Sequence, residues 1–256
     1  MGIPFFNIGG TASIDRLAKL CQIGEGSRVL EVGCGTGANA CYLAERYGCT
    51  VVGVDISKEM VKRATLRAEE QHLSDQATFM IGDAYDLRFS EGEFDVVLTV
   101  FVSQFLDPAK AFLEFHRVLK EGGYLGVNEM YRADDVPPEA RERVDEGVRE
   151  FCELTELPFT LRSPGEWDLA FESARFTDVT VEEHPNSDNP SYSGVVDAFG
   201  GWRVLIVTLW RILVYYVRSG TMRKRFATIS RVKTTLLRNE VTSRYIGYVL
   251  CSGKKP

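Results

Sequence analysis

Glycines and acids near the start of the chain have types and spacing that suit a nucleotide-like ligand. An apolar run, residues 29–32, contains Glu31 and leads into three glycines at alternate positions: Gly33, Gly35 and Gly37. Residues 38–47 have the pattern of a helix, so the glycines fill a turn between a strand and a helix. Glycine lets a ligand approach the backbone, and a helix start favours a carboxylate or a phosphate. The turn is therefore a candidate ligand site.

The glycine spacing alone leaves alternatives open. Gly33-x-Gly35-x-x-Ala38, with Asp55 about twenty residues further on, also fits the fingerprint of a dinucleotide-binding turn. A plain strand-to-helix turn that binds nothing is the simplest alternative. The acid that precedes the glycines is needed to choose between these hypotheses.

Glu31-Val-Gly-Cys-Gly-Thr-Gly37 resembles motif I of the class I (Rossmann-like) S-adenosylmethionine-dependent methyltransferase family. The resemblance implies that S-adenosyl-L-methionine is the cofactor. It assigns the three glycines to cofactor binding and implies that Glu31 faces the methionine ammonium group. A pyrophosphate would gain nothing from a carboxylate at this point, so Glu31 argues against a dinucleotide.

A second acid ends the next predicted strand. Residues 50–55 are a buried apolar run that ends in Asp55, and Ser57 is placed to cap the helix that follows. A carboxylate there can accept both hydroxyls of a ribose, one on each oxygen. A helix-entry aspartate without a ligand is the alternative, and the spacing from Gly35 favours the ribose. The family resemblance places Ile56 against the adenine.

A third acid separates the two cofactor hypotheses. Residues 77–81 are a predicted strand, and Asp83 and Ala84 follow it closely. In the family that the chain resembles, this acid receives the adenine amino group and the next backbone N–H meets the ring. A dinucleotide-binding fold has no fixed need for this acid. The expected cofactor contacts are completed by the residues at the end of the fourth predicted strand: Val100 and Phe101.

Composition and charge narrow the function classes. The 256 residues, 45% of them apolar, are enough for one large α/β domain with an insertion. The net charge of −6 argues against a nucleic-acid partner, because phosphate contacts need a basic surface. Six cysteines show no CxxC pair and no metal-finger spacing, so we expect no metal site. A reduced, cytoplasmic location is the simplest hypothesis, since the first residues also lack the regions of a signal peptide.

The order of predicted elements indicates an α/β fold with a doubly wound, seven-stranded, mostly parallel sheet. Residues 117–126, Arg-Val-Leu-Lys-Glu-Gly-Gly-Tyr-Leu-Gly, resemble the family's path from a helix end through a Gly-Gly turn into strand five. Strands six and seven are expected over residues 176–183 and 245–251. The resemblance implies that the seventh strand is antiparallel beside the fifth. Two further helix starts are predicted from their caps: Thr11 or Ser13, and Ser163.

Some sixty residues separate strands six and seven, too many for a hairpin. We therefore expect a Rossmann-like domain over residues 1–185 and 241–256, and an inserted helical cap over residues 186–240. Three arginines lie on one side of the first cap helix, residues 202–218, which makes that helix amphipathic: Arg203, Arg211 and Arg218. We expect it to be buried, and the alternative is a peripheral contact with anionic membrane through residues 202–238.

The expected reaction is in-line transfer of a methyl group to a small acceptor. The acceptor is expected to be largely apolar, because Phe101, Phe105 and the aromatic residues of the cap would face it. A hydroxyl or ammonium acceptor must also lose a proton. Four residues near the strand ends that form the mouth of the sheet are candidate catalytic groups: Gln104, Glu129, Tyr131 and His184. The alternative is that each has an ordinary role in a loop.

Other classes of function remain open at this stage. A non-catalytic cofactor-binding or membrane-associated regulator would need the same binding residues. A protein or RNA methyltransferase would need a basic groove, and basic residues without any acid gather only over residues 201–239. The sequence does not indicate the identity of the acceptor or the oligomeric state.

Overall fold

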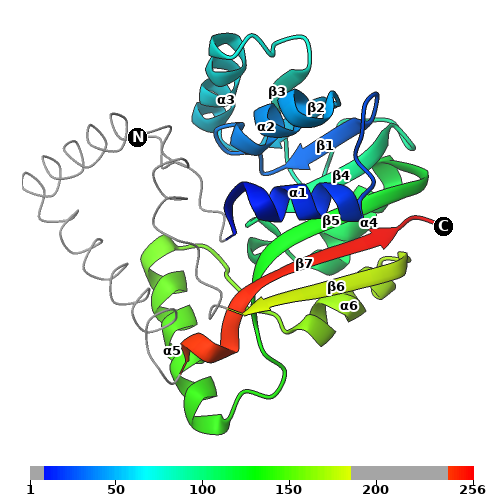
Figure 1. Cartoon of the computed structure of the whole chain (residues 1–256). Helices are drawn as coiled ribbons and strands as arrows, with labels where there is room; N and C mark the ends of the chain where they lie inside the picture. Colours follow the sequence, from blue (N-terminus) through cyan, green and yellow to red (C-terminus); the bar gives the residue numbers. More distant parts are fainter. Residues whose placement is uncertain (1–8, 186–241) are drawn as a thin grey trace, which may run out of the picture.

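The computed structural model describes residues 9–185 and 242–256 (Figure 1). Its centre is a seven-stranded sheet with the order β3-β2-β1-β4-β5-β7-β6. The strands are β1 (Arg28–Val32), β2 (Thr50–Asp55), β3 (Ala77–Ile81), β4 (Phe94–Val100), β5 (Leu119–Arg132), β6 (Thr177–Pro185) and β7 (Ile246–Lys254). The first five strands pair in parallel, and β7 is antiparallel to both β5 and β6. The predicted fold class of the sheet is confirmed.

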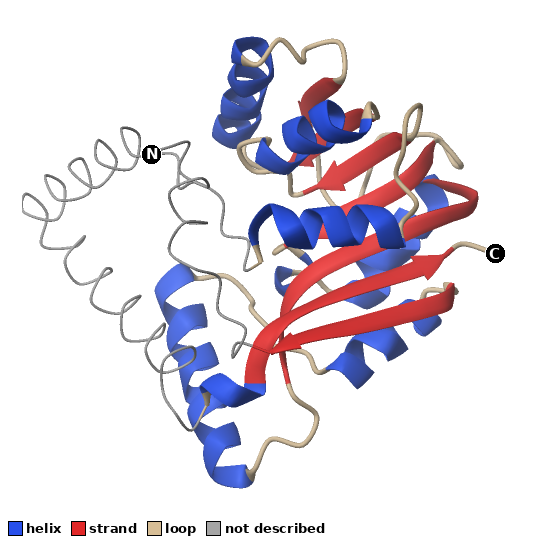
Figure 2. Cartoon of the chain, in the orientation of Figure 1, coloured by secondary structure: helices blue, strands red, loops and turns tan. Residues whose placement is uncertain are grey.

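Helices cover both faces of the sheet, as the blue and red ribbons of Figure 2 show. They are α1 (Gly10–Leu20), α2 (Ala38–Tyr47), α3 (Lys58–Glu70), α4 (Pro108–Val118), α5 (Pro138–Thr155) and α6 (Pro164–Ser173), with two short 3₁₀ helices, η1 (Ser103–Phe105) and η4 (Ser243–Tyr245). The first three helices lie on one face, and α4 and α6 lie on the other (Figure 1). This is the double winding that the sequence predicts.

Two apolar clusters hold these layers together. Phe112, Trp167 and Phe171 are fully buried between the sheet and the pair α4 and α6. Leu17 and Leu43 are fully buried on the opposite face, beneath α1 and α2. Burying each such side chain contributes roughly 1.5–3 kcal/mol. The sheet is therefore a rigid frame for the loops at its edges.

The helix starts agree with the predicted caps in two cases out of three. Ser57 accepts the amide of Met60 at 3.4 Å, and Ser163 forms a capping box with Glu166. The prediction for α1 is wrong, because the helix begins at Gly10 after a Gly9 cap with φ of +104°. Glycine adopts this left-handed conformation without strain, so the helix starts earlier and both predicted capping residues lie inside it.

α5 lies beyond the edge of the sheet where the parallel strands end (Figure 1). Val144 of this helix packs with Phe159, Leu161 and Ile246 in a third apolar cluster, and the ring of Phe105 lies against the same cluster. α5 therefore lies next to η1, beyond the carboxyl ends of the parallel strands. None of the helices over residues 9–185 and 242–256 is long and apolar enough to cross a membrane. The predicted cap, residues 186–240, lies outside the described residues.

Candidate functional site

The three glycines after β1 all have positive φ, +74° for Gly33, +52° for Gly35 and +73° for Gly37. The amide of Gly33 donates to the carbonyl of Val54 at 2.7 Å, which ties the turn to β2. A Cβ at Gly33 would overlap the γ-methyl groups of Val102, and a Cβ at Gly37 would lie 2.7 Å from the ring of Phe79. These two glycines are needed for packing.

Gly35 differs from its neighbours in the turn. A Cβ there would meet no atom of the described residues within 4 Å. Its backbone is therefore open to a ligand while its positive φ still favours glycine. Among the three glycines, Gly35 is the one at which a cofactor could approach the chain closely.

Glu31 lies in a closed position behind this turn, with only 2% of its surface exposed. Its Oε1 accepts a hydrogen bond from Asn39 Nδ2 at 2.8 Å, and its Oε2 is buried without a partner among the described residues. Burial raises the pKa of Glu31 to about 8, against the opposing effect of the hydrogen bond from Asn39. A buried carboxylate with an unused oxygen suits a cationic group of a ligand, so this residue fits the ammonium role that the resemblance implies.

Asp55 uses both carboxylate oxygens within the turn. Oδ2 accepts the amide of Gly35 at 2.9 Å, and Oδ1 accepts the amide of Ser57 at 2.8 Å. A carboxylate has about four acceptor sites, so ribose hydroxyls can bind in addition. The neighbouring Ile56 side chain is 77% exposed, an apolar surface beside the acid.

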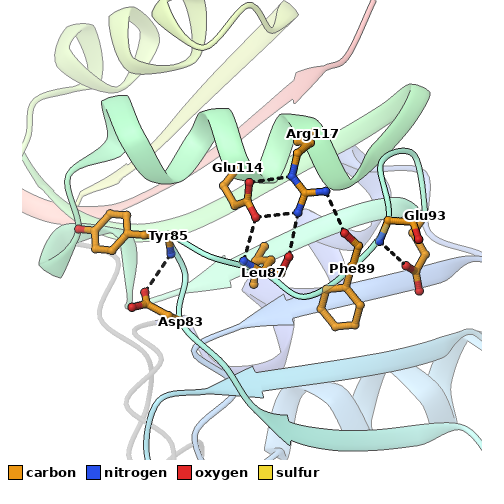
Figure 3. A network of polar contacts seen from close by, with 8 residues as sticks. Asp83, Tyr85, Leu87, Phe89, Glu93, Glu114 and Arg117 are labelled. Carbon is orange, nitrogen blue, oxygen red and sulfur yellow. Dashed lines mark hydrogen bonds and ion pairs between the residues drawn. The ribbon is translucent and has the colours of Figure 1, made fainter.

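Asp83 follows β3 on the same side of the sheet. It is exposed, and its Oδ1 accepts the amide of Tyr85 at 2.9 Å (Figure 3). An open depression of about 300 Å³ lies next to it, lined by Ile56, Ile81, Gly82, Asp83, Asp86 and Arg88. Ala84 is half-buried and packs against the core. The acid, the apolar side chains and the depression together suit an adenine ring.

Phe101, at the end of β4, has φ of +58°, which is uncommon for a residue with a side chain. Its amide donates to the carbonyl of Asn128 at 2.9 Å. Strain of this kind costs about 1–3 kcal/mol and is concentrated at functional sites. Val100 is half-buried and packs against the cluster beneath α1. The sequence gives no signal of the strained backbone.

Glu129 is fully buried on β5. Its Oε1 accepts the amides of Val102 and Ser103 at 2.7 and 2.6 Å, and its Oε2 has no partner among the described residues. Burial raises the pKa of Glu129 to about 8, while the backbone hydrogen bonds and the charge of Arg162 act in the opposite direction. In this arrangement Glu129 holds the loop after β4 and does not reach solvent.

Arg162 is a residue that the sequence analysis missed. Its guanidinium donates to the carbonyls of Ser103 at 3.4 Å and Leu106 at 3.2 Å, and it lies 5.2 Å from the ring centre of Trp167. Burial lowers the pKa of Arg162. The loop over residues 102–106 is thus held by a carboxylate on its amides and a guanidinium on its carbonyls.

The other candidate catalytic residues do not gather at one point. Gln104 is 3% exposed, and its Oε1 is buried without a partner among the described residues. Tyr131 is buried under α4 and α6, and burial together with the charge of Glu183 raises its pKa to about 12. His184 stacks on Tyr248 with ring centres 4.5 Å apart, and Tyr248 packs on the opposite cluster. Gln104 therefore lies on the loop that Glu129 of β5 binds, whereas Tyr131 and His184 belong to different faces of the sheet.

No group of His, Cys, Asp and Glu within the described ranges could hold a metal ion. The six cysteines all lie in the described part of the chain, and none forms a disulfide there. The arrangement at the mouth of the sheet therefore consists of carboxylates, glycine backbone and apolar side chains. Such a set can bind and orient an organic cofactor.

Residues 30–127 match the family model described as "Methyltransferase domain". This range contains Glu31, the glycine turn, Asp55 and Asp83. The match thus covers the residues that the sequence assigns to the cofactor, and it ends on β5 before the segment that forms α5 and α6.

Two curated relatives illustrate the similarity. The 27-O-demethylrifamycin SV methyltransferase of Amycolatopsis mediterranei is 27% identical over 252 residues, which is 96% of this chain and 84% of that protein. The probable tocopherol O-methyltransferase, chloroplastic, of Oryza sativa subsp. japonica is 28% identical over 180 residues, which is 69% of this chain. The chain spans about half of that second relative, 49% of its length.

A solved structure shows the same fold. The crystal structure of the [4+2]-cyclase SpnF is similar with a TM-score of 0.72 and 20% sequence identity, covering 96% of this chain and 81% of that one. Its description as a cyclase shows that a fold of this kind is not tied to one reaction. The evidence for the chemistry has to come from the residues at the strand ends.

Proposed function

We propose that this chain, which carries a class I S-adenosylmethionine-dependent methyltransferase domain, transfers a methyl group from S-adenosyl-L-methionine to a small, largely apolar acceptor. The observation that carries the proposal is Glu31, a buried carboxylate whose Oε2 has no hydrogen-bond partner among the described residues, on the strand that leads into the glycine turn with the open backbone of Gly35. The methionine part of this cofactor carries an ammonium group, which could pair with Glu31 while the rest of that part lies against the backbone of Gly35.

The residues at three adjacent strand ends would hold the cofactor. Glu31 would bind its ammonium, Asp55 its ribose hydroxyls, and Asp83 its adenine amino group beside the exposed side chain of Ile56. These groups lie at the carboxyl ends of β1, β2 and β3, where ligands bind in open α/β sheets. When bound, S-adenosyl-L-methionine supplies an electrophilic methyl group.

The chain's own contribution to the transfer is alignment and exclusion of water. The loop over residues 102–106, which Glu129 and Arg162 hold from opposite sides, would fix the acceptor in line with the methyl group. Gln104 lies on this loop, so among the candidate catalytic residues it is the one that we propose to contact the acceptor. The proton of a hydroxyl or ammonium acceptor would leave at this side of the site.

A small apolar acceptor is supported by three observations. The curated relatives are described as methyltransferases for tocopherol and for a rifamycin. The ring of Phe105 forms part of an aromatic group with Phe151 and Phe159 at the mouth of the sheet. The net charge of −6 does not favour a nucleic acid.

The experiment is incubation with S-adenosyl-L-methionine labelled on its methyl group, using a set of apolar phenols and alcohols as acceptors. Label in the organic extract supports the proposal, and label in precipitated protein or RNA favours a macromolecular acceptor. Binding without turnover on any acceptor favours a regulator. A thermal shift supplies the control for the cofactor, because S-adenosylhomocysteine should stabilise the chain and NAD should not.

We also propose, from the sequence, that the protein makes a peripheral membrane contact through residues 202–238. Nine basic residues and no acid over residues 201–239 suit an anionic lipid surface. Sedimentation with vesicles of anionic and of neutral lipid tests this separately from the methyl transfer. Binding to the anionic vesicles only is the expected result, and binding to neither is evidence against the contact.

A further inference from the structure

The segment between β3 and β4, residues 82–93, contains no helix or strand of its own. It carries Asp83, the residue proposed to bind the adenine. We call residues 83–89 the adenine arm. An irregular segment keeps its position only through contacts with its surroundings, so the groups that hold the arm bear directly on how Asp83 meets a ligand.

One arginine on α4 supplies two of these contacts (Figure 3). Arg117 Nη1 donates to the carbonyl of Phe89 and Nη2 donates to the carbonyl of Leu87, each at 2.8 Å. The same guanidinium donates to both carboxylate oxygens of Glu114, at 2.8 and 2.7 Å. All three of its nitrogen atoms are therefore used in a fixed, planar arrangement.

Glu114 adds a hydrogen bond in which the arm is the donor. Its Oε1 accepts the amide of Leu87 at 2.8 Å, so Leu87 is bound through both its N–H and its carbonyl. The hydrogen bond from Arg117 lowers the pKa of Glu114, and the backbone hydrogen bond from Leu87 adds to this effect. The side chain of Glu114 is only 16% exposed, which protects the pair from screening by salt.

A second contact joins the arm to the start of α4. The hydroxyl of Tyr85 accepts the amide of Asp107 at 2.8 Å, and the amide of Tyr85 donates to Asp83 Oδ1 at 2.9 Å. The position of the Asp83 carboxylate is thus linked to α4 through Tyr85 and through Leu87. Both links depend on the arm keeping its register along the helix.

We propose that Arg117 and Glu114 are positioning residues for the cofactor. They hold the adenine arm on α4 and thereby place the Asp83 carboxylate against the adenine amino group. Neither side chain contacts the cofactor itself. The proposal rests on the proposed function, because it requires that S-adenosyl-L-methionine binds with its adenine at Asp83.

The test compares the affinities of two ligands by calorimetry. One is S-adenosylhomocysteine, and the other is S-inosylhomocysteine, in which the adenine amino group is replaced by an oxygen. The native chain should bind the inosine ligand about tenfold more weakly, since Asp83 loses its donor. In Arg117→Lys, one ammonium cannot replace the guanidinium fork. Its affinity for S-adenosylhomocysteine should fall about tenfold and its preference between the two ligands should shrink to about twofold.

Two further variants complete the design. Glu114→Gln cannot accept both Arg117 hydrogen bonds and should move affinity and preference in the same direction, which keeps the test valid if Arg117→Lys does not fold. Arg16→Lys is the matched control, because Arg16 also donates to both oxygens of a carboxylate, Glu182, but touches no residue of the arm. It should leave affinity and preference as in the native chain.

The outcomes distinguish the two proposals. A native chain that binds neither ligand overturns the proposed function, and this inference with it. A native chain that binds both ligands equally removes Asp83 from the adenine. Folded Arg117→Lys and Glu114→Gln variants that keep the native preference overturn the positioning role alone. In turnover, the positioning role predicts a raised KM for the cofactor with kcat unchanged, whereas partial unfolding would lower the apparent kcat and leave KM as it is.

Discussion

Two parts of the proposed site use charged residues in different ways. We call the strand ends that carry Glu31, Asp55 and Asp83 the proposed cofactor side, and the loop over residues 102–106 with Glu129 and Arg162 the proposed acceptor side. Glu31, Asp55 and Asp83 take their hydrogen bonds from residues 2 to 20 positions away along the chain. Glu129 binds amides 26 and 27 positions away, and Arg162 binds carbonyls 56 and 59 positions away. Local sequence thus arranges the cofactor side, whereas tertiary pairing arranges the acceptor side. Four predictions test this difference, from the largest expected effect to the smallest.

The largest effect is expected on the acceptor side. Glu129→Ala removes the acceptor of two buried amides and takes away the largest of the negative charges that act on Arg162. Breaking a buried charged contact in this way costs about 3–5 kcal/mol of the free energy of unfolding. Urea denaturation followed by circular dichroism measures this value.

Two variants are the controls for Glu129→Ala. Glu129→Gln keeps an oxygen that can accept both amides, so it should lose less stability than the alanine variant. Glu25→Ala removes an exposed acid and should stay within about 0.5 kcal/mol of the native chain. A loss below about 1 kcal/mol in Glu129→Ala would show that the loop after β4 does not depend on this carboxylate.

The second prediction concerns the point where the two sides touch. Gly33 of the cofactor turn has no room for a Cβ, because Val102 of the acceptor loop lies against it. Gly33→Ala should therefore cost about 1–3 kcal/mol for overpacking in addition to the strain of a positive φ. Gly35→Ala introduces the same group at a similar φ with no neighbour within 4 Å, so it should show the strain alone.

Thermal unfolding of the two glycine variants measures the difference. The double variant Gly33→Ala, Val102→Ala should recover part of the loss, since the smaller side chain leaves room for the new Cβ. Equal destabilisation by both alanines would mean that the two loops do not pack as the structure has them.

The fold, and the position of Asp55 and Asp83 at the ends of parallel strands, could be predicted from the sequence for a definite reason. Each parallel strand ends at the same edge of the sheet, so an acid that closes an apolar run must lie beside the glycine turn. Asp55 and Asp83 follow this rule, and Ser57 caps α3 as its position indicates. The antiparallel direction of β7 is a different case, because it was predicted from the family resemblance and not from the residues of the strand.

The acceptor side could not be predicted in the same way. Glu129 and Tyr131 were chosen because they lie near the end of strand five, yet both side chains are buried. Arg162 gave no signal, since its role depends on the segment before α6 reaching the carbonyl of Ser103 on η1. The positive φ of Phe101 likewise accompanies a tertiary contact, the hydrogen bond from its amide to the Asn128 carbonyl. The start of α1 at Gly10 instead follows from the left-handed conformation of Gly9.

The third prediction is made on the cofactor side. Asp55→Ala should weaken binding of S-adenosyl-L-methionine by about 1.5–3 kcal/mol, roughly ten- to hundredfold, through loss of a charge-assisted hydrogen bond. The loss includes the contacts that hold Gly35 and Ser57. Asp55→Asn keeps one acceptor oxygen and should have an intermediate affinity. Calorimetry that shows native affinity in a folded Asp55→Ala chain would remove this residue from the site.

The smallest effect is expected from pH. Burial, with a smaller contribution from the nearby charge of Asp55, raises the pKa of Glu31 to about 8. A carboxyl whose pKa is higher in the folded chain than in the unfolded chain lowers the free energy of unfolding as pH rises from its ordinary value toward 8. The affinity for a cationic ligand changes with pH in the opposite direction: it increases as pH rises, because the ligand binds the ionised carboxylate. From pH 8 to pH 7 the ionised fraction falls about fivefold, which is about 1 kcal/mol in affinity.

The stabilisation of the chain by S-adenosylhomocysteine, measured as the difference in Tm with and without ligand, should therefore increase from pH 6 to pH 8. Glu31→Gln carries no titrating group at this position, so its ligand-dependent stabilisation should be weaker and nearly constant over the same range. An Asp55→Asn chain keeps the Glu31 carboxyl, so its ligand-dependent stabilisation should still increase with pH. A Glu31→Gln chain with the native pH profile would show that the ligand's ammonium group pairs elsewhere. The buried acid that separates this turn from a dinucleotide site would then have a purely structural role beside Asn39.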